Sequence, residues 1–335
     1  MHIPVLSTFK DIEILAVAEM DEDRGRKTAN IWNIPHFYSD YNEMYRNAEL
    51  DGVFICLPNF LHYEAVKNAL QHEINVFCEK PMGLNSQEAF KLVQLAEKKG
   101  LKLAVGYNRR LDNNYQDASK IVKSMQLGRV LQINGTFVSG GPYIGWIPSS
   151  EWFFKDKYGV LYDSGPHLVD LIQHTISDTI AEVSANGISS MHGTDIYDNI
   201  AGVFKTEDDI LGSFNIGWRA GVYHESIQVH GTGCSLFVDP NETLLKHAAY
   251  GPLDKISDNI SSTKNIIGTF MGKTGDTDLP DETFFKEDRA FIDSILNEGE
   301  PSASGEEALR VMEVLDGIRE SLKSHSSIKV IHHEL

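Results

Sequence analysis

Short apolar segments alternate with longer amphipathic segments through the first 110 residues. The apolar segments contain almost no polar positions, which is typical of parallel strands covered on both faces. They are residues 12–18, 53–57, 76–78 and 101–105. The segments between them have the spacing of helices and are residues 21–33, 61–71 and 85–99. This pattern predicts an α/β fold with a doubly wound parallel sheet.

A clearer alternation of polar and apolar positions begins at about Val130 and predicts an antiparallel sheet with one exposed face. The expected strands are residues 130–139, 180–190, 196–205, 210–218, 226–230 and 235–239. One helix, residues 165–177, interrupts them, and the helices 281–297 and 305–324 close the chain. Residues 250–280 are rich in Gly, Asp, Ser and Thr, so we expect a long loop there.

A chain of 335 residues is too long for one ordinary core. The two patterns predict a first domain at residues 1–110 and a second domain at residues 111–335. The second is an α+β domain with a large, mostly antiparallel sheet, and we expect its last helix to pack back on the first domain.

The formal net charge of −18 disfavours nucleic acid and anionic membranes as partners. Cys56, Cys78 and Cys234 are far apart and lie in apolar stretches, so neither a disulfide framework nor a thiolate metal site is expected. No apolar run approaches the roughly 20 residues of a membrane span, and the N-terminus lacks the pattern of a signal peptide. We therefore expect a cytoplasmic protein without a bound metal.

Two groups of polar residues are candidates for chemistry. Glu79 and Lys80 follow the strand 76–78, at the sheet edge where open α/β sheets bind their ligands, although two solvated loop charges would give the same sequence. Asp163 and His167 are four residues apart, so a carboxylate can orient an imidazole that acts as a general base. Alternatively, Asp163 caps a helix and His167 is a packing residue. The third alternative is a zinc site formed by His167, Asp170 and His174. No further zinc ligand lies near these three residues in the sequence.

Four short motifs, in this order and spacing, resemble the Gfo/Idh/MocA family of oxidoreductases over nearly the whole chain. They are Pro58-Asn59 with His62, Glu79-Lys80-Pro81, the run from Gly106 to Arg110, and Asp163 with His167. The resemblance implies a Rossmann-type NAD(P)-binding domain at residues 1–110 and a domain for substrate binding and oligomerisation at 111–335. It also implies NAD-dependent oxidation of a secondary hydroxyl on a sugar, cyclitol or sugar-derived substrate.

The resemblance gives the catalytic roles to Lys80, Asp163 and His167. His167 is the expected base, Asp163 positions the substrate and the imidazole, and Lys80 stabilises the developing alkoxide. It also implies a cis peptide bond between Lys80 and Pro81. The expected substrate contacts are Lys80, Tyr107, Arg109, Trp152, Asp163 and His167.

The resemblance places the cofactor along one edge of the first domain. The expected contacts are Glu19, Pro58, Asn59, His62, Glu79, Lys80, Asn108 and Arg109. Glu19 can accept hydrogen bonds from the adenosine ribose and repel a 2′-phosphate, so NAD is favoured over NADP. Arg24 and Arg26 lie close enough in sequence to weaken that preference. Asn59 and His62 can equally be a turn residue and a residue of the helix start.

The family's first strand and its G-x-G-x-x-G turn are absent, because the chain begins MHIPVL, which resembles the helix that follows that turn. We expect the strands that end at Glu19 and Leu57 to lack their shared neighbour. We hypothesise that about a dozen residues, one strand and its turn, precede Met1 in the working protein. A stop codon immediately upstream of Met1 would exclude this.

Two other functions are compatible with the resemblance: a glycosidase that uses NAD in a redox cycle, and a ligand-sensing relative without catalysis. Loss of the glycine turn favours the sensor, whereas Lys80, Asp163 and His167 favour an enzyme. The exposed face of the second sheet is the expected surface of self-association, and the resemblance implies a homodimer or homotetramer.

Overall fold

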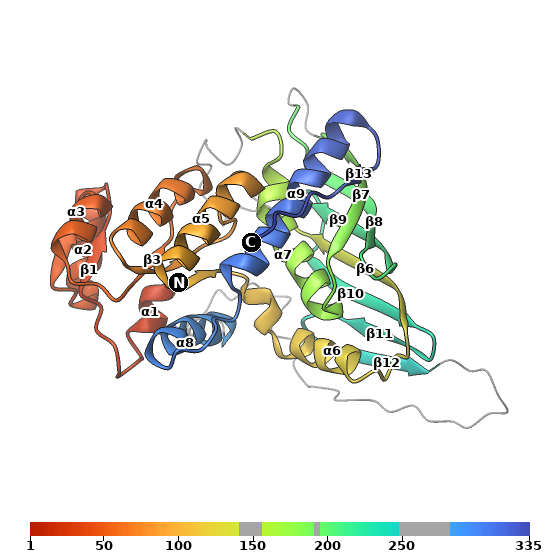
Figure 1. Ribbon diagram of the computed structural model, residues 1–335, viewed down its shortest axis with the longest axis horizontal. Helices are drawn as coiled ribbons and strands as arrows, with labels where there is room; N and C mark the ends of the chain where they lie inside the picture. The colour runs from red at the N-terminus through yellow and green to blue at the C-terminus, as the bar shows by residue number, and fades with distance from the viewer. Residues whose placement is uncertain (141–155, 191–194, 248–281) are drawn as a thin grey trace. The chain divides into compact units, whose positions relative to one another are not determined.

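The computed structural model describes residues 1–140, 156–190, 195–247 and 282–335. These residues form two compact units (Figure 1). Unit 1 comprises the described residues of Met1–Asn108 and Thr277–Leu309 with Leu335, and unit 2 comprises those of Arg109–Asp276 and Arg310–Glu334. Helix α8, which the sequence assigned to the second domain, is therefore part of unit 1.

Unit 1 contains five parallel strands in two separate sheets. Strands β1 (Ala16–Ala18) and β2 (His36–Tyr38) form one sheet, and β3 (Gly52–Ile55), β4 (Asn75–Cys78) and β5 (Leu103–Val105) form the other in that order. β1 and β3 do not pair with each other in the described part of the chain. The predicted parallel α/β fold is confirmed, but β2 was missed because three half-exposed residues carry too weak a pattern.

Six helices of the described chain lie wholly in unit 1 with these strands. They are α1 (His2–Leu6), α2 (Glu22–Trp32), α3 (Tyr41–Asn47), α4 (Asn59–Gln71), α5 (Ser86–Lys99) and α8 (Glu282–Leu296). The 3-10 turn Asn108–Leu111 spans the boundary, because unit 2 begins at Arg109. Helix α5 shows why the sequence folds as it does locally. Asn85 Oδ1 accepts the N–H of Glu88 at 2.9 Å, and Gly100 ends the helix at a φ of 67°. The Glu88 carboxylate accepts the backbone N–H of Leu84 at 2.9 Å.

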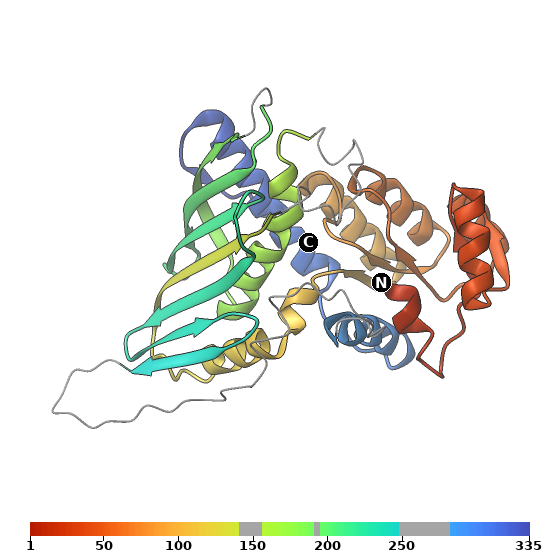
Figure 2. The ribbon, with the colours of Figure 1, turned by 180° about the vertical axis from the view of Figure 1, so that it is seen from behind.

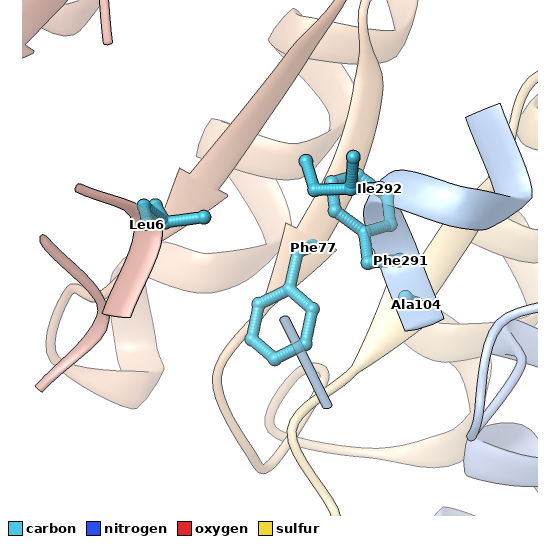
Figure 3. Close-up of a cluster of buried hydrophobic side chains, with 5 residues drawn as sticks. All are labelled: Leu6, Phe77, Ala104, Phe291 and Ile292. Atoms are coloured by element: carbon cyan, nitrogen blue, oxygen red, sulfur yellow. The ribbon is translucent and has the colours of Figure 1, made fainter. Parts of the chain in front are cut away.

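A cluster of buried apolar side chains explains why α8 belongs to unit 1. Leu6 of α1, Phe77 of β4 and Ala104 of β5 meet Phe291 and Ile292 of α8 (Figure 3). The ring centroids of Phe77 and Phe291 are 5.8 Å apart. Since burial of one such side chain contributes about 1.5–3 kcal/mol, α8 is held to the sheet mainly by apolar packing.

Unit 2 is built on an eight-stranded sheet with the order β12-β11-β10-β6-β9-β8-β7-β13. Only the pairing of β6 with β9 is parallel among these strands as described, so the predicted mostly antiparallel sheet is confirmed. The bounds are β6 Val130–Val138, β7 Ile180–Ile188, β8 Asn199–Thr206, β9 Leu211–Gly217, β10 His224–Gly231, β11 Cys234–Val238, β12 Thr243–His247 and β13 Ile328–Lys329. The sequence missed β12, β13 and helix α6 (Asn113–Lys123). The expected loop 250–280 lies outside the described residues.

Helix α7 (Gly159–Ile176) lies along one face of this sheet (Figures 1 and 2). Gly135 of β6 permits the approach, because a Cβ there would lie 2.8 Å from Leu168 of α7. The prediction that this helix begins near Asp163 or Gly165 was wrong. Gly165 and Pro166 are typical of a helix start, but here they are buried inside α7, which begins a full turn before Asp163.

A capping box begins helix α9 (Gly305–Ser324). Glu307 N donates to Ser304 Oγ at 3.2 Å, and Ser304 N donates to Glu307 Oε2 at 3.0 Å.

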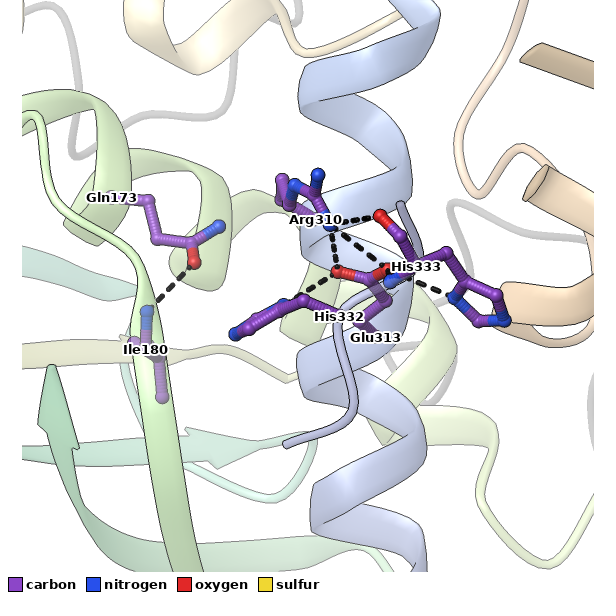
Figure 4. A network of polar contacts seen from close by, with 6 residues as sticks. All are labelled: Gln173, Ile180, Arg310, Glu313, His332 and His333. Carbon is purple, nitrogen blue, oxygen red and sulfur yellow. Dashed lines mark hydrogen bonds and ion pairs between the residues drawn. The ribbon is translucent and has the colours of Figure 1, made fainter. Parts of the chain in front are cut away.

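The C-terminal segment of unit 2 is attached to α9 by a buried carboxylate (Figure 4). Glu313 accepts from His332 Nδ1 at 2.7 Å, from the backbone N–H of His333 at 2.7 Å and from Arg310 at 3.0 Å. Burial alone would raise the pKa of Glu313, but these donors outweigh it and lower the pKa.

Candidate active site

Lys80 lies in a short loop at the carboxyl end of β4, and the backbone of both neighbouring strands holds that end. Glu79 N donates to Ile55 O of β3 at 3.0 Å, and Gly106 N, directly after β5, donates to Cys78 O at 2.9 Å. The Lys80–Pro81 peptide bond is cis, as the resemblance implied. The half-buried Lys80 side chain thus projects from the middle strand of three.

His62 connects this loop to the end of β3. Its ring is buried, with Nδ1 2.7 Å from Pro81 O and Nε2 2.7 Å from Leu57 O. Burial lowers the pKa of His62, although the two carbonyl groups oppose the shift. Pro58 and Asn59 begin α4 beside it. Both ring nitrogens of His62 therefore face backbone oxygens, and the histidine supports the two strand ends that carry Asn59 and Lys80.

A buried histidine that the sequence analysis did not single out holds Glu79. His2 Nδ1 lies 2.7 Å from Asp288 Oδ1 of α8, and His2 Nε2 lies 3.1 Å from Glu79 Oε1. Burial lowers the pKa of His2, but hydrogen bonds that include those to both carboxylates outweigh it and raise the pKa to about 12. The pKa of Glu79 is lowered in turn, because the charge of His2 outweighs the effect of burial. His2 and Asp288 are 286 positions apart, so no local pattern signals this group.

Glu19 stands at the end of β1, in the other sheet of unit 1. Arg24 donates to both of its carboxylate oxygens, from Nε at 2.9 Å and from Nη2 at 2.7 Å. These bonds to Arg24 lower the pKa of Glu19. Arg26 instead pairs with Glu22 on α2. Of the two arginines that we considered near Glu19, Arg24 is the one in contact with it.

Two further predicted contacts of unit 1 are buried. Tyr107 is 1% exposed, and Asn108 donates from Nδ2 to Thr283 Oγ1 at 3.2 Å. Gly106 precedes them in close contact with the loop, because a Cβ there would lie 3.2 Å from Glu79 Oε2. Trp152, predicted as a substrate contact, lies outside the described residues.

In unit 2, Asp163 and His167 are half-buried on α7, and each meets an aromatic residue of the sheet. Trp218 donates its indole N–H to Asp163 Oδ2 at 2.9 Å. The His167 ring stacks on Phe137 of β6, with centroids 5.8 Å apart and planes at 17°. From the sequence, Phe137 and Trp218 were interpreted only as strand residues. Strand alternation predicts the face of the sheet on which a side chain lies, but it does not predict which residues of α7 that side chain contacts.

Arg109 lies near the same aromatic ring. Its guanidinium carbon is 5.9 Å from the Phe137 centroid, and its Nε is 3.6 Å from Glu225 Oε2. The neighbouring Arg110 is buried and donates from Nε to Asp170 Oδ2 at 3.0 Å. Asp170 is therefore engaged by an arginine, which argues against the zinc alternative. No group of three metal-ligating side chains occurs within the ranges that the structure describes.

The structure brings the predicted residues together in separate groups. In unit 1, Glu79, Lys80, His62 and Asn59 collect at the ends of β3 and β4, and Glu19 ends β1. In unit 2, Asp163, His167 and Arg109 surround Phe137 and Trp218. Among the helices described, none has both the length and the apolar character that crossing a membrane requires.

Two family models match consecutive parts of the chain. Residues 1–107 match the NAD-binding Rossmann fold of the GFO/IDH/MocA oxidoreductase family, and residues 115–237 match the GFO/IDH/MocA C-terminal domain.

Curated and solved relatives agree with this match. Uncharacterized oxidoreductase YrbE of Bacillus subtilis is 26% identical over 187 residues, which is 56% of this chain and 53% of that protein, so the chain aligns with about half of its length. Myo-inositol 2-dehydrogenase of Thermotoga maritima is 23% identical over 98% of this chain and 95% of its own. The structure of scyllo-inositol dehydrogenase from Lactobacillus casei with NAD(H) and scyllo-inositol has a TM-score of 0.79 at 20% identity, covering 98% of this chain and 95% of that one. At this identity the structure shows the shared fold.

The raised pKa of His2 predicts a pH-dependent stability. Since about 12 in the folded state exceeds the ordinary 6.5, the contribution of His2 is complete below pH 6.5 and declines as the pH rises towards 12. Between these values the stability of the protein should fall by up to about 1.4 kcal/mol per pH unit. Urea denaturation of the protein and of His2→Gln at pH 7 and pH 9 measures this, and the variant should lose most of the slope.

His72→Gln, at an exposed position after α4, is the matched control and should keep the slope of the unchanged protein. An equal slope in His2→Gln and in the unchanged protein would contradict the assignment.

Proposed function

Because the chain belongs to the Gfo/Idh/MocA family of NAD-binding oxidoreductases, we propose that it oxidises a secondary hydroxyl of a sugar, cyclitol or sugar-derived substrate. The observation that carries this proposal is the position of Lys80, directly after the middle strand of a parallel sheet and before a cis proline. Ligands of open α/β sheets bind at this edge. Relatives named as inositol dehydrogenases support the substrate class.

The residues present fit NAD in part. Glu19 is a carboxylate with a lowered pKa, so it stays ionised and can accept the ribose hydroxyls. Lys80, Asn59 and the supporting His62 are grouped at the ends of β3 and β4, and we assign this group to the nicotinamide side of the cofactor. The G-x-G-x-x-G turn that would hold the pyrophosphate is not found in this sequence.

The three proposed catalytic residues have distinct tasks on the reacting hydroxyl. NAD, when bound, supplies the hydride acceptor. An imidazole nitrogen of His167 takes the hydroxyl proton, and stacking on Phe137 keeps the ring in one plane. The Lys80 ammonium lowers the energy of the developing alkoxide. Asp163, held by the indole of Trp218, orients the substrate and the imidazole.

Lys80→Ala should abolish turnover while leaving the fold intact. Loss of the cation should lower kcat by about 10²–10³-fold, the effect of removing one stabilising group from a developing oxyanion. The measurement is NADH formation with a panel of polyols and sugars, beginning with myo-inositol. NADH must accumulate in step with substrate oxidised, because a glycosidase that uses NAD in a redox cycle returns the hydride.

Lys67→Ala, which removes a half-buried lysine paired with Glu64 on α4, is the control and should not change kcat. Equal activity of Lys80→Ala and the unchanged protein would remove the central assignment. Failure of the protein to bind NAD or NADH, measured by fluorescence, would instead favour the ligand-sensing alternative.

We propose that NAD is the preferred cofactor and that the contact between Glu19 and Arg24 sets this preference. Glu19→Gln should weaken NAD binding and narrow its advantage over NADP, because Arg24 then loses its carboxylate partner and can meet a 2′-phosphate. The Kd for NAD should rise about tenfold, and the ratio of the Kd for NADP to that for NAD should fall about tenfold, as for one hydrogen bond to a charged group. Quenching of protein fluorescence by each cofactor measures it. Glu22→Gln, beside Arg26, is the control, and an unchanged preference in Glu19→Gln would exclude this role.

We also propose that the chain associates through the face of the unit 2 sheet that α7 does not cover. Asn134, Val203 and Leu211 line a hollow on this face, and Val203 and Leu211 are 58% and 53% exposed. Exposed apolar side chains in the middle of a wide sheet are typical of an association surface.

Val203→Asp should reduce the molar mass in solution from that of a homodimer or homotetramer towards that of one chain, because a buried unpaired charge opposes association. Size-exclusion chromatography with light scattering measures the mass. Ile31→Asp, at an exposed apolar position of α2 in unit 1, is the control. A mass unaffected by Val203→Asp would place the interface elsewhere.

A further inference from the structure

His2 is the centre of a buried polar group in unit 1 that the proposed reaction does not use. Its ring contacts three phenyl rings, with centroids between 5.2 and 5.5 Å away; they belong to Phe54 of β3, Phe77 of β4 and Phe284 of α8. Only 6% of His2 is exposed. Because a charged imidazole loses its hydration among such rings, a histidine with two ionisable partners here indicates a requirement other than stability.

Two carboxylates hold the ring by its two nitrogens. His2 Nδ1 lies 2.7 Å from Asp288 Oδ1 of α8, and His2 Nε2 lies 3.1 Å from Glu79 Oε1. Since the pKa of His2 is raised to about 12, both nitrogens carry a proton near neutral pH, and the ring donates to both carboxylates. Asp288 is itself buried, and the apolar cluster holds α8 to the sheet (Figure 3). This end of the group is therefore fixed.

The other end of the group reaches the main chain of Lys80. The second oxygen of Glu79, Oε2, accepts the backbone N–H of Lys80 at 3.2 Å. Gly106 leaves room for this oxygen, because a Cβ there would lie 3.2 Å from it. One carboxylate oxygen thus faces His2, and the other holds the residue that carries the proposed catalytic ammonium. The order of contacts is Asp288, His2, Glu79 and Lys80.

We propose that His2 and Asp288 are positioning residues, which fix the Glu79 carboxylate and through it the main chain from which the Lys80 side chain projects. Without His2, the glutamate side chain would adopt several rotamers, and the Lys80 N–H would lose a fixed acceptor. Stabilising a developing alkoxide requires the ammonium at one position. The role of Lys80 rests on the proposed function, whereas the four residues and their contacts lie within unit 1.

Hydrogen exchange tests the positioning role without turnover. Mass spectrometry of overlapping peptides isolates the amide of Lys80, since Pro81 has no N–H. In His2→Asn the shorter amide keeps a donor at the place of Nδ1 but loses the donor to Glu79. The Lys80 amide should then exchange about tenfold faster, as expected when one hydrogen bond to a charged group is lost. Unchanged exchange at Lys80 in His2→Asn would overturn the proposal.

Two further variants separate positioning from a general loss of stability. His2→Gln keeps a donor at the place of Nε2, so its Lys80 amide should exchange more slowly than that of His2→Asn. Glu313→Gln removes a buried carboxylate that accepts from His332 in unit 2. Loop amides exchange mainly through local opening, so this control should leave the rate at Lys80 unchanged. Equal acceleration at Lys80 in Glu313→Gln and His2→Asn would overturn the proposal.

Kinetics with NAD and myo-inositol test the consequence for the proposed reaction. His2→Asn should lower kcat by about 10–10²-fold, the effect of displacing a reacting group by roughly 1 Å, with KM changed far less. In a Glu79→Gln background the same substitution should add little, because His2 acts through the Glu79 side chain. A change confined to KM, or full additivity of the two substitutions, would overturn the proposal.

Two failures are separated in advance. If the unchanged protein oxidises no polyol, the proposed function fails, and the exchange rate of the Lys80 amide still decides the positioning role. If His2→Asn does not fold, Asp288→Ala replaces it, because this variant keeps the imidazole but removes the acceptor of Nδ1. Unchanged exchange at Lys80 in that variant would equally overturn the proposal.

Discussion

Parallel pairing of β4 with strands on both sides is the constraint on which the candidate site of unit 1 depends. The carboxyl ends of β3, β4 and β5 must lie at one edge, so the residues that follow them are neighbours whatever their side chains. The ring of Phe77 in β4 packs against the rings of Phe54 and Phe291, which stabilises the position of β4 in the core. Glu79 and Lys80 follow β4 directly, so the packing of this strand also determines where these two residues lie at the carboxyl edge of the sheet.

Buried carboxylates beside basic groups hold side chains in unit 2, as the contacts of His2 with Glu79 and Asp288 do in unit 1. Asp170 holds Arg110, Glu225 faces Arg109, and Glu313 binds Arg310 and two histidines. Each carboxylate comes from a regular element, and two of them, Asp170 and Glu313, come from the helices α7 and α9. Because an unpaired buried charge is costly, such groups restrict the packing to few arrangements. The surroundings of Asp163 and His167 therefore depend on electrostatics as much as on apolar contact.

Most of the fold was predictable because it is carried by periodic patterns. All strands except β2, β12 and β13, and helix α5, follow from apolar runs, alternation and capping residues within a few positions of one another. What could not be predicted depends on distant partners. His2 is unremarkable in sequence until Asp288 is beside it, and Glu225 is one acid of an alternating strand until register brings it next to Phe137. The start of α7 was missed because Gly165 and Pro166 are tolerated inside this helix.

The apolar cluster of unit 1 has a consequence for the order in which the protein is made. Phe77 and Leu6 leave the ribosome early, whereas Phe291 and Ile292, which cover them, follow every strand of the unit 2 sheet except β13. Roughly 170 residues separate the two parts of unit 1, which corresponds to about 10–30 s of synthesis. During that interval one side of the nascent parallel sheet is without its covering helix. The early half of the chain therefore carries apolar surface that is prone to aggregation until the late half has been translated.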